Sequence, residues 1–325
     1  METLKPATTL TEQIRLLRER GMDVDDPLAR QWLASVSYYR LSGYWYVYRI
    51  LDTHQETGKP SRLDNFDHGT TFADVASLYE FDRKLRTLIH DGMERIEIAL
   101  RARIGELLVQ TGPLSHRDPA KFRPEFEHAQ WIATAERRVK RARKHSQSIE
   151  HYTKKYGDYP FWVLADALDF SDISKLYDGM LPEDQHSIAG SFGLTASTDQ
   201  LSAKQKGKYY KRHPFARWCE QLTVLRNACA HHGRVWNRRL TPASTNALRT
   251  IPRLASMPEG QSDRLFGALL LMSLLIATIS PGSTWPLKVR VLIETEYAPL
   301  PGRSVNELGF PDGWREVAPW SPAPS

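Results

Sequence analysis

The spacing of hydrophobic residues along this chain is helical over most of its length. The strongest pattern lies between Phe72 and Leu108, where large apolar residues recur every three or four positions. Such spacing puts them on one side of an α-helix and predicts a long amphipathic helix. Among the charged residues on its other sides, Glu94 and Glu97 are expected to pair with arginines rather than to form a metal or glycosidase site.

Other helices are predicted on both sides of this one. Thr9 and Glu12 have the spacing of a capping box that opens a helix ending near Gly21. Residues 52–71 have the polar, Gly- and Pro-containing composition of a connection with a short strand or turn. The aromatic run 38–46 is expected in the core rather than stacked on bases. Further helices are predicted over 28–48, up to about 156 after Pro124, 159–177, 214–232 and 265–279, with two short helices and a loop in 182–208.

These patterns predict an all-α fold in three regions. We expect an N-terminal helical region over 1–71, a helical core over 72–240, and a C-terminal region over 241–325 with one core helix and an irregular tail rich in Pro and Trp. The apolar run 265–279 is shorter than the ~20 residues that span a membrane, and the N-terminus lacks the apolar segment of a signal peptide. The sequence thus predicts a cytoplasmic protein.

The two cysteines, Cys219 and Cys229, are expected neither to pair nor to bind metal. On one helix they lie ~15 Å apart along the axis, whereas the Cα atoms of a disulfide lie within ~7 Å of each other. The adjacent His231 and His232 point ~100° apart and cannot converge with a distant thiol on zinc. We therefore expect reduced cysteines and no zinc site at these residues, and we predict no cofactor.

The distribution of positive charge favours an anionic partner. The formal net charge is +6, and two stretches concentrate basic residues, the second of them interleaved with tyrosines. Lysine, arginine and aromatic side chains together suit a phosphate backbone with stackable bases. A solvated helix face and a flexible loop are equally good interpretations of the two stretches. The candidate RNA-binding residues are Arg137, Arg138, Lys140, Arg141, Arg143 and Lys144 in the first stretch, and Lys204, Lys206, Lys208, Lys211 and Arg212 in the second.

The run Leu225–Asn237 carries the candidate chemistry. It places Arg226, Asn227 and His231 within little more than one helical turn. A guanidinium binds phosphate through a planar fork of donors, and an imidazole can give or take a proton near neutral pH. This combination favours a reaction on a phosphodiester.

One copy of this run makes an incomplete site. Arg226 and His231 diverge by roughly 140° around a helix, and His231 supplies only one proton-transfer group. Attack of a 2′-hydroxyl on its own phosphate uses both a base and an acid, so two copies related by a dimer axis would complete the site. The alternative is structural: Arg226 pairs with a carboxylate, Asn227 bonds locally, and the histidines lie at a helix C-terminus before Gly233.

The run also resembles the signature segment of the Abi-like family of abortive-infection phage-resistance proteins. Six further segments agree with that family in the same order along nearly the whole chain. After Pro160-Phe161-Trp162 the family pattern leads us to expect a Glu, where this chain has Asp166. The other segments are Glu12–Ile14 with Arg20-Gly21, Ser37–Tyr44, Leu78–Arg86, Glu94–Arg101, and Gly309–Trp314 before Trp320.

The resemblance implies membership of the HEPN superfamily, whose R-x4-H motif forms a metal-independent endoribonuclease site at a homodimer interface. Arg226 would hold the phosphate, His231 would act as acid and base, and Asn227 would orient the imidazole or the RNA. It implies a HEPN-type helical bundle and a bacterial phage-defence toxin restrained by a small non-coding RNA or a protein antitoxin. A non-catalytic protein that holds a structured or small regulatory RNA is the alternative. Lesser candidates for substrate contact are His232, Arg234 and Asp166.

Overall fold

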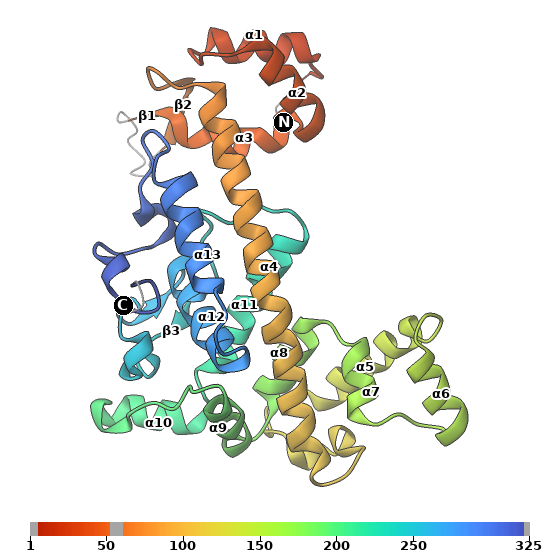
Figure 1. Cartoon of the computed structure of the whole chain (residues 1–325). Helices are drawn as coiled ribbons and strands as arrows, with labels where there is room; N and C mark the ends of the chain where they lie inside the picture. Colours follow the sequence, from red (N-terminus) through yellow and green to blue (C-terminus); the bar gives the residue numbers. More distant parts are fainter. Residues whose placement is uncertain (1–5, 53–60, 322–325) are drawn as a thin grey trace. The chain divides into compact units, whose positions relative to one another are not determined.

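The structure is a computed structural model that describes residues 6–52 and 61–321 (Figure 1). Within these ranges the protein is mainly α-helical, with two small two-stranded antiparallel sheets. The predicted all-α fold class is confirmed. No helix in the described part of the chain is long and apolar enough to cross a membrane.

The chain folds into two compact units. The first contains residues up to Arg86 together with Val289–Glu307, and the second contains Thr87–Lys288 and the residues from Leu308 onward. The functional division into regions 1–71, 72–240 and 241–325 remains a prediction. The elements of the first unit are α1 (Leu10–Glu19), α2 (Asp26–Val36), α3 (Tyr38–Trp45), β1 (Arg49–Asp52), β2 (Ser61–Phe66), the first part of α4 (Phe72–Val109), the end of α13 (Trp285–Leu292) and a π-helical turn over Ile293–Tyr297.

Side-chain caps decide where the helices of the first unit begin. Thr9 and Glu12 form the predicted capping box, in which the Glu12 carboxylate accepts the Thr9 N–H at 2.7 Å. The single helix predicted over 28–48 is wrong, because Ser37 interrupts it. Ser37 has a positive φ of 75°, and its hydroxyl accepts the Arg40 N–H at the start of α3.

The aromatic run at α3 is divided between core and surface. Tyr44 and Trp45 are buried, whereas Tyr39 is 89% exposed. The Tyr44 hydroxyl donates to Asp82, which also pairs with Arg86, so the buried charges of this unit satisfy one another. The core role predicted for the run is confirmed for its last turn. The predicted short strand after it is confirmed by the β1–β2 hairpin.

Two helices of the second unit agree well with the apolar pattern of the sequence. The remainder of α4 follows the predicted long helix, and α12 (Leu265–Ile279) has the predicted bounds. A helix that is hydrophobic on all sides is normally a core helix, and α12 is buried from Leu265 to Ile276. The other elements are α5 (His128–Ala142), α6 (Gln147–Tyr156), α7 (Phe161–Ala167), α8 (Phe170–Gly179), α9 (Pro182–Ser191), α10 (Ala203–Lys211), α11 (Phe215–Ala230), β3 (Ala243–Ser244) and β4 (Gln261–Ser262).

Two of the helices predicted in the second unit are each divided in the structure. The helix expected up to residue 156 ends at Ala142, and α6 begins after Ser146, whose hydroxyl accepts the Ile149 N–H. The helix expected over 159–177 breaks at Leu168, and Asp169 forms a capping box that opens α8. The two short helices predicted in 182–208 are confirmed as α9 and α10.

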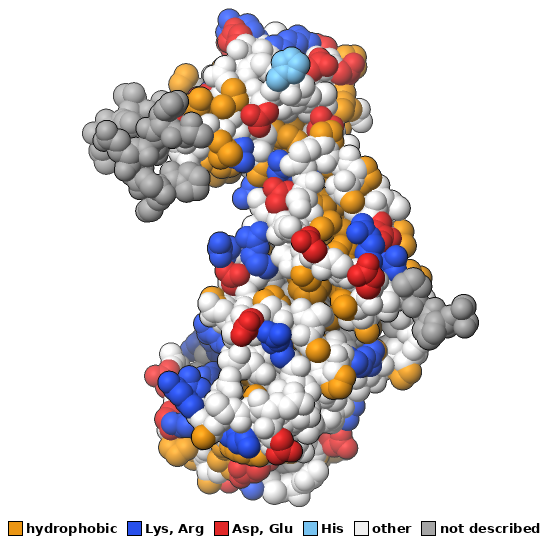
Figure 2. Space-filling view, turned by 90° about the vertical axis from the view of Figure 1, so that its left-hand side faces the viewer, with side chains coloured by type: hydrophobic (Ala, Val, Ile, Leu, Met, Phe, Trp, Pro, Cys, Tyr) orange, Lys and Arg blue, Asp and Glu red, His pale blue; other side chains and the backbone are white. Residues whose placement is uncertain are grey.

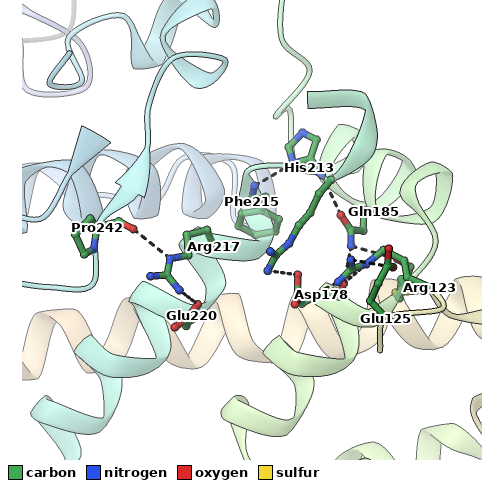
Figure 3. A network of polar contacts seen from close by, with 11 residues as sticks. Arg123, Glu125, Asp178, Gln185, His213, Phe215, Arg217, Glu220 and Pro242 are labelled. Atoms are coloured by element: carbon green, nitrogen blue, oxygen red, sulfur yellow. Dashed lines mark hydrogen bonds and ion pairs between the residues drawn. The ribbon is translucent and has the colours of Figure 1, made fainter. Parts of the chain in front are cut away.

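A buried histidine fixes the start of α11 (Figure 3). The His213 ring donates from Nε2 to the Leu194 carbonyl at 3.0 Å and accepts the Phe215 N–H at Nδ1 at 3.1 Å. This pair of bonds requires the neutral ring, because a charged ring has no acceptor. Burial of the ring, with His186 close by, lowers the pKa of His213 to about 3.

This arrangement predicts that the free energy of unfolding falls in mild acid. Between a pKa near 6.5 in the unfolded chain and about 3 in the folded one, the unfolded state holds the extra proton. The loss is up to about 1.4 kcal/mol per pH unit as the pH falls below 6.5. Chemical denaturation across pH 4–7 measures the free energy of unfolding at each pH. We expect this free energy to depend less steeply on pH in His213→Gln than in the wild type. The exposed His145→Gln is the control for losing an imidazole, and an unchanged slope for His213→Gln would contradict the assignment.

Candidate functional site

The run Leu225–Asn237 lies at the C-terminal end of α11. The His232 N–H bonds the Cys229 carbonyl at 3.0 Å, and the Gly233 N–H bonds the Ala228 carbonyl at 2.7 Å. With His232 at φ 56°, this is the Schellman pattern that ends a helix. His231 and His232 are therefore exposed at a helix terminus, while the side chain of Leu225 is buried.

Arg226 extends from α11 toward α4. Its Nε lies 3.6 Å from the carboxylate of Glu97, and its Nη1 donates to Asn227 Oδ1 at 3.4 Å. Glu97 also binds Arg101 at 2.6 Å, and Arg101 donates to the carbonyl of Leu168 at the end of α7. One carboxylate therefore joins the side chains of two arginines on two helices. The predicted pairing with arginines is confirmed for Glu97, but Glu94 has no ion-pair partner among the described residues.

A hollow of about 230 Å³ opens beside the Arg226 guanidinium. Asn227 and His231 are not part of its described lining, and no hydrogen bond or ion pair in the described chain joins Arg226 to His231. Within one chain, no hydrogen bond or ion pair among the described residues thus joins the phosphate-binding candidate to the proton-transfer candidate, in agreement with their predicted divergence on the helix. The lining residues are His90, Met93, Glu94, Glu97, Ile98, Arg101 and Arg226.

The sequence analysis did not identify His90 as a candidate. His90, Glu94, Glu97 and Arg101 are spaced by four, three and four residues, so they share one face of α4. That spacing was the available signal, but it gave no indication that this face meets Arg226. The hollow beside Arg226 is therefore lined by one imidazole, that of His90, a type of group that can transfer a proton.

The carboxylate beside Arg226 is Glu97 rather than Asp166. Asp166 is exposed on α7 and lines a neighbouring hollow of about 360 Å³ together with Arg101 and Trp162. Ile98 lines both hollows and is 58% exposed, and Trp162 is 50% exposed. Two large apolar side chains thus face solvent next to the candidate site.

The two basic stretches are only partly available to a ligand. Arg138 binds Asp169 and Asp172, and Arg212 binds Asp178, so these two guanidinium groups have internal partners. In the first stretch Lys140, Arg141, Arg143 and Lys144 are exposed. Acidic and basic side chains are interspersed over the face shown in Figure 2, so the net charge of +6 does not form a uniform field there.

The positions of the two cysteines and of Arg234 fit a structural role for much of α11 and its C-terminal end. Cys219 and Cys229 are both buried and neither forms a disulfide, and burial raises the pKa of the Cys219 thiol well above its usual value. A buried neutral thiol is a poor nucleophile. Arg234 is half-buried just beyond the helix end.

A model of the Abi-like protein family matches residues 31–237, which is more than half of the chain. The chain belongs to the Abi-like family. Membership associates this Abi-like protein with abortive infection, a form of phage defence. No curated protein and no solved structure matches it.

The matched range includes both sides of the candidate site in this Abi-like protein. It contains α4 with His90, Glu97 and Arg101, and it ends at Asn237, the last residue of the run described above. The resembling segments Glu12–Gly21 and Gly309–Trp314 lie outside the matched range. Their relation to the family remains a prediction.

Replacing Glu97 should destabilise the second unit more than replacing Asp166. In Glu97→Ala, the partly buried Arg101 and Arg226 both lose their carboxylate partner, at a cost of about 1–3 kcal/mol. The exposed Asp166→Ala should change stability by no more than about 0.5 kcal/mol. Urea unfolding of both variants measures the difference. Equal destabilisation by the two substitutions would show that Glu97 is not the organising carboxylate.

Proposed function

We propose that this Abi-like protein is a metal-independent endoribonuclease of the HEPN type that acts in phage defence. The single observation that carries the proposal is the pair Arg226 and His231 on one helix end, with the spacing R-x4-H and with both side chains accessible to a ligand. Family membership supports the biological setting. The resemblance to HEPN nucleases supports the reaction.

Arg226 has the chemistry to bind the scissile phosphate. Its Nε faces Glu97 at 3.6 Å and its Nη1 contacts Asn227, which hold the planar group in one orientation. The other N–H groups of the fork remain for two phosphate oxygens, a geometry that a lysine cannot reproduce. Charge that develops on the phosphate during attack is stabilised by this pre-oriented cation.

His231 supplies one of the two proton transfers in the reaction. A base removes the proton from the ribose 2′-hydroxyl, its oxygen bonds to the adjacent phosphorus, and the bond from phosphorus to the 5′-oxygen breaks. An acid then protonates that 5′-oxygen. The products are a 2′,3′-cyclic phosphate and a 5′-hydroxyl, and no water or redox partner is consumed.

The second proton-transfer group would come from a second copy of the chain. Ile98 and Trp162 are half-exposed apolar side chains, and Ile98 lines the Arg226 hollow itself. Homodimer interfaces are enriched in apolar and aromatic side chains, so these two would suit such an interface. A copy seated on them would bring its own His231 toward the site, whereas His90 is the group that would replace it within one chain.

We expect His231→Ala to abolish RNA cleavage while the protein stays folded. Loss of a general acid–base group lowers a rate by ~10²–10⁴-fold, and Arg226→Lys should also fail because a point charge cannot replace the fork. Cleavage of a labelled RNA in EDTA, with circular dichroism as the folding control and His145→Ala as the matched histidine control, tests this. Full cleavage by folded His231→Ala would refute the mechanism, and binding without cleavage by the wild type would favour the RNA-holding alternative.

Mixed dimers test whether the site is shared between copies. If one arginine and one histidine from different chains suffice, mixing Arg226→Ala with His231→Ala subunits should restore part of the cleavage. If each site needs both histidines and both arginines, the mixture should be inactive. In either case, Trp162→Ser should lower the fraction of dimer and the cleavage activity together. Sedimentation at the assay concentration gives the oligomeric state. If the monomer were fully active and His90→Ala abolished that activity, the site would lie within a single chain and would not be shared.

A further inference from the structure

The largest hollow of the second unit that we describe lies at the other end of α11. Its volume is about 830 Å³, and it is bounded by α10, by Pro214 before α11, and by segments near residues 123 and 244. Its lining includes five cationic side chains and one carboxylate. The charged lining residues are Arg123, Lys204, Lys208, Lys211 and Arg212, with Glu125 as the carboxylate.

One face of α10 supplies a row of lysines to this groove. Lys204, Lys208 and Lys211 are spaced by four and three residues and therefore point the same way. All three are exposed, and in residues 6–52 and 61–321 no ion pair or hydrogen bond engages their ammonium groups. Lys206 lies on the opposite side of the helix and is not among the lining residues. The row is thus an uncompensated strip of positive charge about 10 Å long.

Asp178 holds the two arginines of the groove in place (Figure 3). Its carboxylate binds Arg212 at 2.5 Å and Arg123 at 3.5 Å, and its carbonyl accepts the Arg123 Nε–H at 2.9 Å. Gln185 donates to the same carbonyl at 2.8 Å and accepts the His213 N–H at 2.9 Å. The arginines are therefore fixed by a framework connected to the start of α11, while the lysines beside them remain free to bind.

On the basis of the proposed function, on which this inference rests, we propose that this groove binds the phosphate backbone of single-stranded RNA at a site separate from Arg226 and His231. A row of lysines acts as a line of point charges that follow a polyanion without identifying bases. A small anion would need donors that converge on one point, and the row extends along the helix instead. The groove therefore suits an extended strand.

The length of α11 separates this groove from the candidate catalytic residues. The helix has 16 residues, which at 1.5 Å per residue is about 24 Å. At 3.4 Å per nucleotide of a stacked strand, an RNA of about seven nucleotides covers that distance. The groove should thus raise the affinity for longer RNAs without taking part in bond cleavage.

Binding should be measured in the His231→Ala background with a fluorescent 20-nucleotide oligouridine. Each lost phosphate contact lowers the slope of log affinity against log salt by ~0.7 for a single strand. We expect Lys208→Gln to lower it by about that amount, and the triple variant Lys204→Gln, Lys208→Gln, Lys211→Gln by about 2. Lys206→Gln removes the same charge from the other face of α10. Although Lys206 belongs to the predicted basic stretch, it lies outside the groove, so this change should leave the slope unchanged. If Lys206→Gln and Lys208→Gln lowered the slope equally, the groove would not be a specific RNA site. The same conclusion would follow if pyrophosphate displaced all of the bound RNA.

Cleavage of RNAs of different length separates this proposal from the proposed function. With His231 intact, the triple lysine variant should raise KM for a 20-nucleotide RNA and leave kcat unchanged, while a four-nucleotide RNA should be cleaved as by wild type. A wild-type protein that binds RNA through these lysines but cleaves none would refute the nuclease and retain the groove. Normal cleavage with lysine-independent binding would refute the groove alone.

Discussion

The Glu97 carboxylate is the constraint on which the candidate site depends. It is nearly buried on α4, contacts the guanidinium groups of Arg101 and Arg226, and is linked through Arg101 to the backbone at the end of α7. A nearly buried carboxylate requires a partner of opposite charge. The need to satisfy Glu97 therefore draws Arg226 toward α4, and the face of α11 that would bind a phosphate is set by that attraction.

Backbone hydrogen bonds mark the end of α11. The Schellman bonds made by His232 and Gly233 stop the helix immediately after Ala230. Because the preceding residues Ala228 and Cys229 are buried, the chain cannot move inward, and His231 is left at the surface. The same local geometry fits the structural interpretation of the run and the catalytic one. What distinguishes them is the accessible arginine beside a hollow, which a purely structural pair does not require.

The sequence predicted the elements whose apolar positions are regular and missed those that depend on tertiary contacts. The helix α4 and the helix α12 follow directly from apolar spacing over many residues. The breaks at Ser37 and Asp169 were missed, since a capping residue in a periodic run looks like an ordinary polar position until its hydrogen bonds are known. In the site, spacing predicted the divergence of Arg226 and His231. It could not show that Glu97 rather than Asp166 would face Arg226, because partners from separate helices leave no local pattern.

The two ends of α11 present opposite electrostatic environments to an RNA. The N-terminal end of a helix carries partial positive charge and its C-terminal end partial negative charge. At the N-terminal end this field adds to the charge of the α10 lysines, so a phosphate strand in the proposed groove would be attracted without contacting a catalytic group. At the C-terminal end the partial negative charge of the helix disfavours a phosphate, so a nearby cation would favour its approach. In the nuclease that we propose, Arg226 would supply such a cation, so its guanidinium would serve the approach of the phosphate as well as the reaction.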